Sequence, residues 1–197
     1  MMDKVRRVFW ILFYRLLLKV KNVSYGSSMR ICDRLYLKTG KNAILKIGEN
    51  FAFSSGGGYN PLARNIKGSI TIEDNAKLII GDNVGISSCC LWVFDSLKIG
   101  KGSKIGADSI LLDSDAHSLN YLERGNSKTD RPNAKRQGIT IGEDVLIGTR
   151  CIILKGVSIG NRSIIGSGSV VVKSIPEDCI AAGNPAKVIK VINKEPK

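Results

Sequence analysis

The chain has 197 residues, 43% of them hydrophobic and only 6% aromatic, which suffices for one domain with an aliphatic core. Its formal net charge is +13, which predicts an anionic partner such as a phosphorylated ligand, a membrane surface or nucleic acid. Five cysteines without a CxxC spacing argue against a zinc site and favour a reducing, intracellular compartment.

The N-terminus predicts an amphipathic, basic helix. Its apolar residues recur at helical spacing, and Arg15 cuts the apolar run short of the ~20 residues that a membrane-spanning helix needs. No small-residue cleavage site follows, so we do not expect a signal peptide. Two interpretations remain open. The helix packs on the body or on a neighbouring subunit, or residues 1–21 contact an anionic membrane surface, with Trp10, Phe13 and Tyr14 at the headgroups.

A six-residue repeat dominates the rest of the chain. It is clearest from Ile141, where the sequence reads IGEDVL, IGTRCI, ILKGVS, IGNRSI, IGSGSV, VVKSIP. An aliphatic residue leads each block, and the fifth residue is usually small or β-branched. This period fits neither a helix nor simple alternation. It predicts one short strand and one bend per block, so that three blocks close a triangular coil and stacked coils pair ~4.8 Å apart.

The same pattern appears earlier in the chain, with slips. Earlier blocks are led by Ile80, Ile86, Ile99, Ile105 and Leu111. We therefore expect the coils to run from about residue 35 to 180, with the glycine-rich SSGGGYNP (54–61) as an excursion. The repeat makes Cys151 a small interior residue rather than a reactive thiol.

The repeat breaks at the sequence DSDAHSLN, which begins at Asp113 and contains the single histidine of the chain. If the coil continued, His117 would occupy an interior aliphatic position and Asp115 the small interior position before it. Burying an unpaired carboxylate there would cost several kcal/mol, so the coil should end near residues 112–113. Residues 118–138 have no six-fold phase and predict a loop that leaves the prism.

The residues at this break suit acyl transfer to a hydroxyl. A sugar hydroxyl is a poor nucleophile at neutral pH, and an imidazole can take its proton. A neighbouring carboxylate can fix the histidine tautomer and stabilise the imidazolium. Asp113 and Asp115 stand four and two positions before His117, and either could orient the histidine or bind acceptor hydroxyls. Both could equally serve turn formation.

The sequence resembles the hexapeptide-repeat acyltransferases over most of residues 70–190. The tail AAGNPAKVIK is especially similar to the acetyl-coenzyme A branch, which contains maltose, galactoside and polysaccharide O-acetyltransferases. The resemblance implies a mainly β fold, a left-handed parallel β-helix over residues 23–190 with an excursion loop at 118–138. An amphipathic helix (1–22) precedes it and a tail (191–197) follows. The left hand comes from the resemblance, since parallel crossovers are usually right-handed.

The resemblance also implies the site. In the related enzymes the catalytic histidine sits where a loop leaves the coil, which His117 matches, although relatives often show His-Pro where this chain has His117-Ser118. Coenzyme A would lie along a coil edge between two subunits of a trimer. The matching cofactor-binding positions are Gly148, Thr149, Gly166 and Ser167, with Lys173, Lys187 and Lys190 as basic positions near its phosphates. Each lysine could equally be solvated surface.

The predicted function is transfer of an acetyl group from acetyl-CoA to a hydroxyl of a saccharide or lipid-linked saccharide, in capsule, O-antigen or exopolysaccharide biosynthesis. We expect a cytoplasmic homotrimer, with the inner face of the membrane as an alternative position, and no metal. N-acetylation of an amino-sugar or antibiotic and a non-catalytic β-helix scaffold remain open. A zinc hydratase relative would need several histidines. Nucleic acid is disfavoured because basic and aromatic residues are not interleaved outside the N-terminus.

Overall fold

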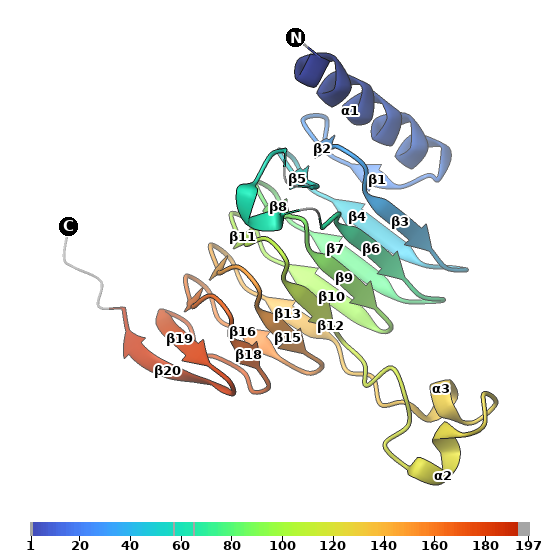
Figure 1. Cartoon of the computed structure of the whole chain (residues 1–197), viewed down its shortest axis with the longest axis vertical. Helices are drawn as coiled ribbons and strands as arrows, with labels where there is room; N and C mark the ends of the chain where they lie inside the picture. Colours follow the sequence, from blue (N-terminus) through green and yellow to red (C-terminus); the bar gives the residue numbers. More distant parts are fainter. Residues whose placement is uncertain (1, 57, 65, 193–197) are drawn as a thin grey trace.

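In the computed structural model, which describes residues 2–56, 58–64 and 66–192, the chain winds into a stack of triangular coils (Figure 1). Three sheets form the three faces of the resulting prism. The first sheet contains β1 (Ser24–Tyr25), β4 (Ile44–Ile47), β7 (Lys77–Ile80), β10 (Ser96–Ile99), β13 (Ile139–Ile141) and β16 (Ser158–Ile159). The second contains β2 (Arg30–Cys32), β5 (Ala52–Ser54), β8 (Gly85–Ser87), β11 (Lys104–Ile105), β14 (Leu146–Ile147), β17 (Ile164–Ile165), β19 (Cys179–Gly183) and β20 (Ala186–Val191). The third contains β3 (Tyr36–Thr39), β6 (Ser69–Ile72), β9 (Cys90–Val93), β12 (Ile110–Leu112), β15 (Ile152–Leu154) and β18 (Val170–Val171).

Up to β18, strands three apart in the chain are hydrogen-bonded neighbours, so each of these coils contributes one strand to each sheet, whereas in the last coil β19 pairs with β17. The pairs are parallel up to β19, which pairs antiparallel with β20. The register keeps the repeat in step from coil to coil, as in the pairing of Ile99 with Ile141 and of Ile105 with Ile147. The fold is therefore the predicted left-handed parallel β-helix.

The leading side chains of the repeat fill the interior of the prism, as predicted. Those of the clearest run are at most 1% exposed: Ile141, Ile147, Ile153, Ile159, Ile165 and Val171. Burial of one such side chain contributes about 1.5–3 kcal/mol to folding. Cys151, a fifth-position residue, is also buried, and burial raises the pKa of its thiol. This confirms Cys151 as a packing residue.

Buried serines bond one coil to the next at the corners. The Ser103 hydroxyl donates to the Gly142 carbonyl at 2.8 Å and accepts from the Val145 N–H at 3.1 Å. Ser109 makes the same pair of bonds one corner later, to Gly148 and Cys151. A small hydroxyl at these positions therefore fills the narrow interior and also satisfies backbone groups that the bend leaves unpaired.

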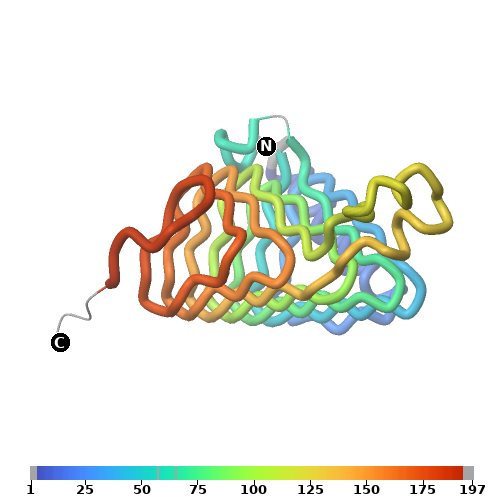
Figure 2. Tube along the Cα trace, turned by 90° about the horizontal axis from the view of Figure 1, so that it is seen from below, coloured from blue at the N-terminus to red at the C-terminus, as the bar shows by residue number. Residues whose placement is uncertain are grey.

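The coils begin earlier than residue 35, because β1 and β2 already pair with the next coil. Tyr25, Ile31 and Leu37 stand six residues apart and pair with Ile47, Phe53 and Ile70. Figure 2 shows the coils stacked along the whole prism. The period of six is thus present in the first coil, but the sequence pattern did not indicate it because a tyrosine occupies the leading position.

Helix α1 (Met2–Val20) lies across the first coil and closes that end of the prism (Figure 1). Its Tyr14 and Leu18 are buried, and the Tyr14 hydroxyl both donates to the Leu35 carbonyl and accepts from the Leu35 N–H at 2.7 Å. The packing interpretation is therefore correct for this side of the helix. None of the helices in the described part of the chain is long and apolar enough to cross a bilayer.

Two segments leave the stack, and both views show them projecting from it (Figures 1 and 2). The first follows β5 and contains the short 3-10 helix η1 (Pro61–Ala63). The second, between β12 and β13, contains α2 (Tyr121–Arg124) and α3 (Asp130–Asn133). The predicted tail 191–197 starts in the last residue of β20 and, beyond residue 192, lies outside the described residues.

We predict that Ser103→Ala lowers the free energy of unfolding by about 1–3 kcal/mol, because a buried carbonyl and a buried N–H lose their shared hydroxyl. Ser158→Ala is the control, since that side chain is exposed, and its effect should stay within about 0.5 kcal/mol. Denaturant unfolding measures both. Equal midpoints for the two variants would contradict the bridging role of Ser103.

Candidate active site

The chain leaves its regular path directly after β12, at Asp113. In the regular coils, backbone N–H groups at this corner donate to carbonyls of the next coil, but here the next coil departs as a loop. The Asp113 carboxylate, 1% exposed, replaces those carbonyls and accepts the N–H groups of Phe94 (2.7 Å), Asp95 (2.9 Å) and Ser96 (2.8 Å). Burial raises the pKa of Asp113, and these three donors oppose the rise. Asp113 therefore terminates the coil, and both oxygens of its carboxylate accept hydrogen bonds from backbone N–H groups.

Asp115 ties the base of the loop to the following coil. Its Oδ1 lies 2.6 Å from the Nζ of Lys155, and the two side chains are 17% and 29% exposed. Its Oδ2 is buried and has no hydrogen-bond partner within the described parts of the chain. The Asp115 N–H donates to the carbonyl of Lys135, where the loop returns. Asp115 therefore has a structural ion pair, and within the described parts of the chain no hydrogen bond joins its carboxylate to the histidine ring.

His117 forms a short hydrogen bond with Asp130, from the start of α3. The His117 Nδ1 lies 2.7 Å from Asp130 Oδ2, and the hydrogen bond to His117 is the main cause that lowers the pKa of Asp130. Because an ionised carboxylate only accepts, Nδ1 carries the proton and Nε2 keeps its lone pair in the neutral ring. The His117 side chain is 64% exposed, whereas that of Asp130 is 12% exposed. The pair thus presents a basic nitrogen toward the surface.

The loop holds Asp130 in place through its own hydrogen bonds. The Ser118 N–H donates to Asp130 Oδ1 at 2.8 Å, so both carboxylate oxygens are engaged. The Ser118 hydroxyl donates to Glu123 in α2, and the Thr129 hydroxyl donates to the Glu123 carbonyl at 2.9 Å. The hydrogen bond from Ser118 keeps the pKa of Glu123 below its usual value. The loop is therefore an ordered scaffold for the His117–Asp130 pair.

Some of the predicted coenzyme positions border one groove. A cavity of about 400 Å³ lies over β5, β8, β11 and β14, and Gly148, Thr149 and Ser167 are part of its lining. Gly166 follows β17 one coil further on, next to Gly148 in the stack. A Cβ on Gly148 would lie 2.6 Å from the Ser167 nitrogen, so the stacking itself requires glycine there. The groove beside these positions leaves room for a ligand to approach the backbone.

His117 and this groove lie on different edges of one prism. We call the corner between the third and first sheets the loop edge, which carries Asp113, His117, Lys155 and Lys173. We call the corner between the second and third sheets the glycine edge, which carries Gly148, Thr149, Gly166 and Ser167. A single chain therefore does not bring the predicted base and the predicted coenzyme backbone positions together.

The three predicted basic positions are also divided. Lys173 is exposed on the loop edge. Lys187 and Lys190 are exposed on β20, where they pair with Ala182 and Ile180 of β19, next to the glycine edge. Lys187 and Lys190 therefore lie next to the glycine edge, whereas Lys173 lies on the loop edge with His117.

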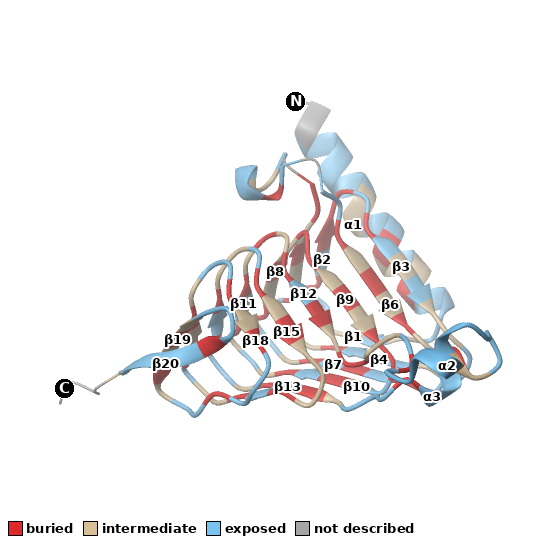
Figure 3. Cartoon of the chain, turned by 60° about the horizontal axis from the view of Figure 1, so that its bottom comes forward, coloured by how far each residue is buried: buried red, intermediate tan, exposed pale blue. Residues whose placement is uncertain are grey.

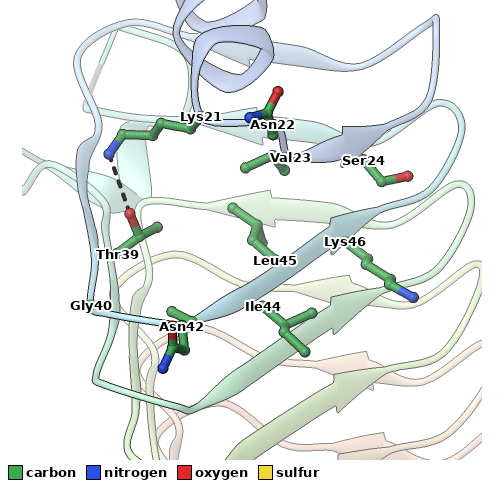
Figure 4. Close-up of a pocket in the computed structure, with 11 residues that line it drawn as sticks. Lys21, Asn22, Val23, Ser24, Thr39, Gly40, Asn42, Ile44, Leu45 and Lys46 are labelled. Atoms are coloured by element: carbon green, nitrogen blue, oxygen red, sulfur yellow. Dashed lines mark hydrogen bonds between the residues drawn. The ribbon is translucent and has the colours of Figure 1, made fainter.

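A second groove, of about 360 Å³, lies at the other end of the stack, where α1 ends and the first two coils begin. Figure 4 shows Lys21, which donates to the Thr39 hydroxyl at 3.2 Å, and Lys46, which lies on β4. No predicted site residue lines it. In the described residues no group of histidine, cysteine and acidic side chains is arranged to hold a metal ion.

Comparison with known proteins agrees with the repeat and the coil. A family model described as bacterial transferase hexapeptide (six repeats) matches residues 138–173. The E. coli K12 protein provisionally named lipopolysaccharide biosynthesis O-acetyl transferase WbbJ is 31% identical over 156 residues, which cover 78% of this chain and 74% of that protein. This chain belongs to the bacterial hexapeptide transferase family.

Other members are longer or more distant. The 2,3,4,5-tetrahydropyridine-2,6-dicarboxylate N-acetyltransferase of Halalkalibacterium halodurans is 35% identical over 141 residues, but this hexapeptide transferase spans only 52% of its length. Among solved structures, a point mutant of AntD, an N-acyltransferase from Bacillus cereus, matches with a TM-score of 0.70 at 18% identity, over 91% of this chain and 90% of that one. At that identity the similarity concerns the fold.

The structure changes one element of the site expected for this hexapeptide transferase. The orienting contact expected from Asp113 or Asp115 is made by Asp130, thirteen residues after the histidine. The sequence offered a weak signal for it, an acidic residue in the first turn of a short helix after Thr129. Because the loop lacks a repeat phase, sequence spacing alone did not bring Asp130 to His117.

We predict that His117→Ala raises the pKa of Asp130 toward the usual aspartate value, because the carboxylate loses the hydrogen bond that mainly lowers it. Carboxyl ¹³C chemical shifts followed through an acid titration measure this pKa. Lys155→Ala is the matched control: it removes the ion pair of Asp115 in the same loop base and should leave the Asp130 pKa unchanged. An unchanged Asp130 pKa in His117→Ala would contradict the pairing.

Proposed function

We propose that this hexapeptide transferase moves an acetyl group from acetyl-CoA to a hydroxyl group of a saccharide, with His117 as the general base. The observation that carries the proposal is the His117–Asp130 pair, which presents Nε2 at the surface where the loop leaves the coil. The name of the relative WbbJ, an O-acetyl transferase of lipopolysaccharide biosynthesis, supports the acceptor class. Capsule, O-antigen and exopolysaccharide intermediates are acceptors of this kind.

The step follows from the geometry of the pair. His117 Nε2 removes the proton of the acceptor hydroxyl as its oxygen attacks the thioester carbonyl. The Asp130 carboxylate stabilises the imidazolium that forms. The C–S bond then breaks, the acetyl group stays on the acceptor oxygen, and the coenzyme thiolate receives the proton from His117. The histidine returns to its starting tautomer, so one acetyl group moves for each coenzyme released.

We propose a homotrimer in which the loop edge of one subunit faces the glycine edge of the next. The groove of about 400 Å³ beside Gly148 and Thr149 offers a slot for the pantetheine arm, with Lys187 and Lys190 near the phosphates. Separation of His117 from these positions within one chain supports a shared site, and Lys173 would then join it from the loop edge. The solved AntD structure contains coenzyme A, which supports the same cosubstrate here.

Transfer to an amine is the second candidate, because several of the matched proteins carry names of N-acyl transfer. The AntD structure contains dTDP-4-amino-4,6-dideoxyglucose, and the Halalkalibacterium protein is named an N-acetyltransferase. Mild alkali separates the two outcomes, since it releases an acetyl ester but not an acetamide.

The five free cysteines favour a reducing compartment, so we place the reaction in the cytoplasm.

We predict that His117→Ala lowers acetyl transfer by about 10²–10⁴-fold and retains coenzyme A binding, because the general base is lost and the groove is intact. Asp130→Asn should also lower transfer, since the neutral amide does not stabilise the imidazolium and offers one oxygen for the two N–H donors of His117 and Ser118. Labelled acetyl-CoA, with nucleotide sugars and lipid-linked oligosaccharides as acceptors, provides the assay, and calorimetry measures coenzyme binding. Wild-type rates in His117→Ala would refute the base assignment, and no transfer by the wild type to any acceptor would favour the scaffold alternative.

A mixing experiment tests the shared site. Thr149→Trp should block the groove and His117→Ala should remove the base, so each variant alone is inactive. If equal amounts are unfolded together and reassembled at random, we expect about one quarter of the wild-type activity, because that share of boundaries combines an intact histidine with an intact groove. No recovery, with trimers present by light scattering, would place both parts of the site in one subunit.

A further inference from the structure

The outward side of α1 is apolar. Seven large hydrophobic side chains on this helix are 42–71% exposed: Val5, Val8, Phe9, Leu12, Phe13, Leu16 and Val20. They recur at helical spacing on the side opposite to Tyr14 and Leu18, which pack on the first coil. The helix therefore has two apolar sides, of which the β-helix covers one. We call the uncovered side the outer face of α1.

The fold does not account for the outer face. The inner contacts of Tyr14 and Leu18, with the ion pair of Arg6 and Asp33 at 2.8 Å, attach the helix to the coil. Arg15 adds two hydrogen bonds to the Met29 carbonyl. Leu12 and Leu16 contribute little to this attachment, because they are 59% and 64% exposed. A contiguous apolar surface of this kind on a folded domain marks a docking site.

The positive charge of the protein is concentrated at the same end. Residues 1–41 contain ten basic and two acidic residues, and so carry eight of the thirteen net positive charges. One of the two acids, Asp33, is already paired with Arg6. Lys4 and Lys19 lie among the exposed apolar residues of α1, and Lys21 and Lys46 line the groove at its C-terminal end (Figure 4). The docking partner is therefore expected to be both apolar and anionic.

The position of α1 leaves its outer face accessible. The helix runs alongside the strands of the first coil, across the end of the stack and not along its length (Figure 1). Figure 3 shows its outer face as an exposed strip, while the residues toward the coil are buried. The loop and glycine edges run along the length of the prism, so subunits that meet there leave this end open.

We propose that α1 lies in the interface of a bilayer that contains anionic lipid, with its outer face among the acyl chains and its lysines at the headgroups. Interfacial helices combine these two properties, an apolar face and flanking cations. A second copy of the chain fits less well as occupant, because two α1 helices would bring the same positive charges together. The prism would then project away from the membrane along its axis, with α1 between the first coil and the bilayer.

The test compares the full-length wild type with a Leu12→Glu/Leu16→Glu variant in flotation with vesicles. We expect the wild type to float with vesicles of phosphatidylcholine and phosphatidylglycerol, and much less with phosphatidylcholine alone. The double variant should lose binding by at least about tenfold, because two leucines no longer enter the acyl region and two negative charges approach the lipid. Leu122→Glu, the same kind of substitution at a single exposed leucine of the loop, should bind like the wild type.

Three results would overturn the proposal. The wild type fails to bind phosphatidylglycerol vesicles, or it binds neutral vesicles equally well, or the double variant binds as strongly as the wild type. Light scattering without vesicles tests the other occupant: a lower oligomer mass for Leu12→Glu/Leu16→Glu would assign the outer face to a second copy. Thermal unfolding of both variants checks the fold. If the glutamate variant does not fold, a Lys4→Gln/Lys19→Gln variant, which keeps the outer apolar face, serves as the test and should bind anionic vesicles more weakly than the wild type.

Discussion

The interior of the prism takes an aliphatic side chain at the leading position of each block of six residues, and this constraint determines the rest of the structure. Each coil pairs its backbone with the coils on both sides, so a residue in the leading position cannot turn outward without moving a strand out of register. Ile99, Ile105 and Leu111 meet the requirement and are at most 2% exposed. The next position in that count is His117, which cannot meet it. The chain must therefore leave the stack there, and the place of the candidate base follows from packing.

Leaving the stack creates a second requirement, which Asp113 satisfies. The corner at Phe94–Ser96 loses the carbonyls of the next coil, and three N–H groups without acceptors, that of Phe94 buried, would destabilise the preceding coils. One carboxylate accepts all three. An acidic residue beside a catalytic candidate thus has a purely structural reason to be there. The proximity of Asp113 to the histidine in the sequence was therefore a poor guide to the role of Asp113.

The parts that follow from the repeat could be predicted, and those that depend on the loop could not. The period of six yields the strands, the buried residues, the role of Cys151 and the point of exit, since each depends only on counting along the chain. The starting point was misjudged because Tyr25 occupies a position where an aliphatic residue was expected. Asp130 was missed because its approach to His117 depends on Ser118, Glu123 and the turn before α3, none of which has a periodic signal.

The two ends of the prism and its edges have separate tasks in the proposed assembly. Because the loop and glycine edges run parallel to the prism axis, a three-fold axis in the same direction joins subunits along their lengths and places three α1 helices at one end. A single short interfacial helix binds a membrane weakly, whereas three that bind together gain from their high effective concentration. The trimer that completes the site would therefore also strengthen membrane contact, and the active sites would stand at a fixed height above the lipid. A lipid-linked saccharide, held at the same surface, meets this geometry better than a freely diffusing sugar does.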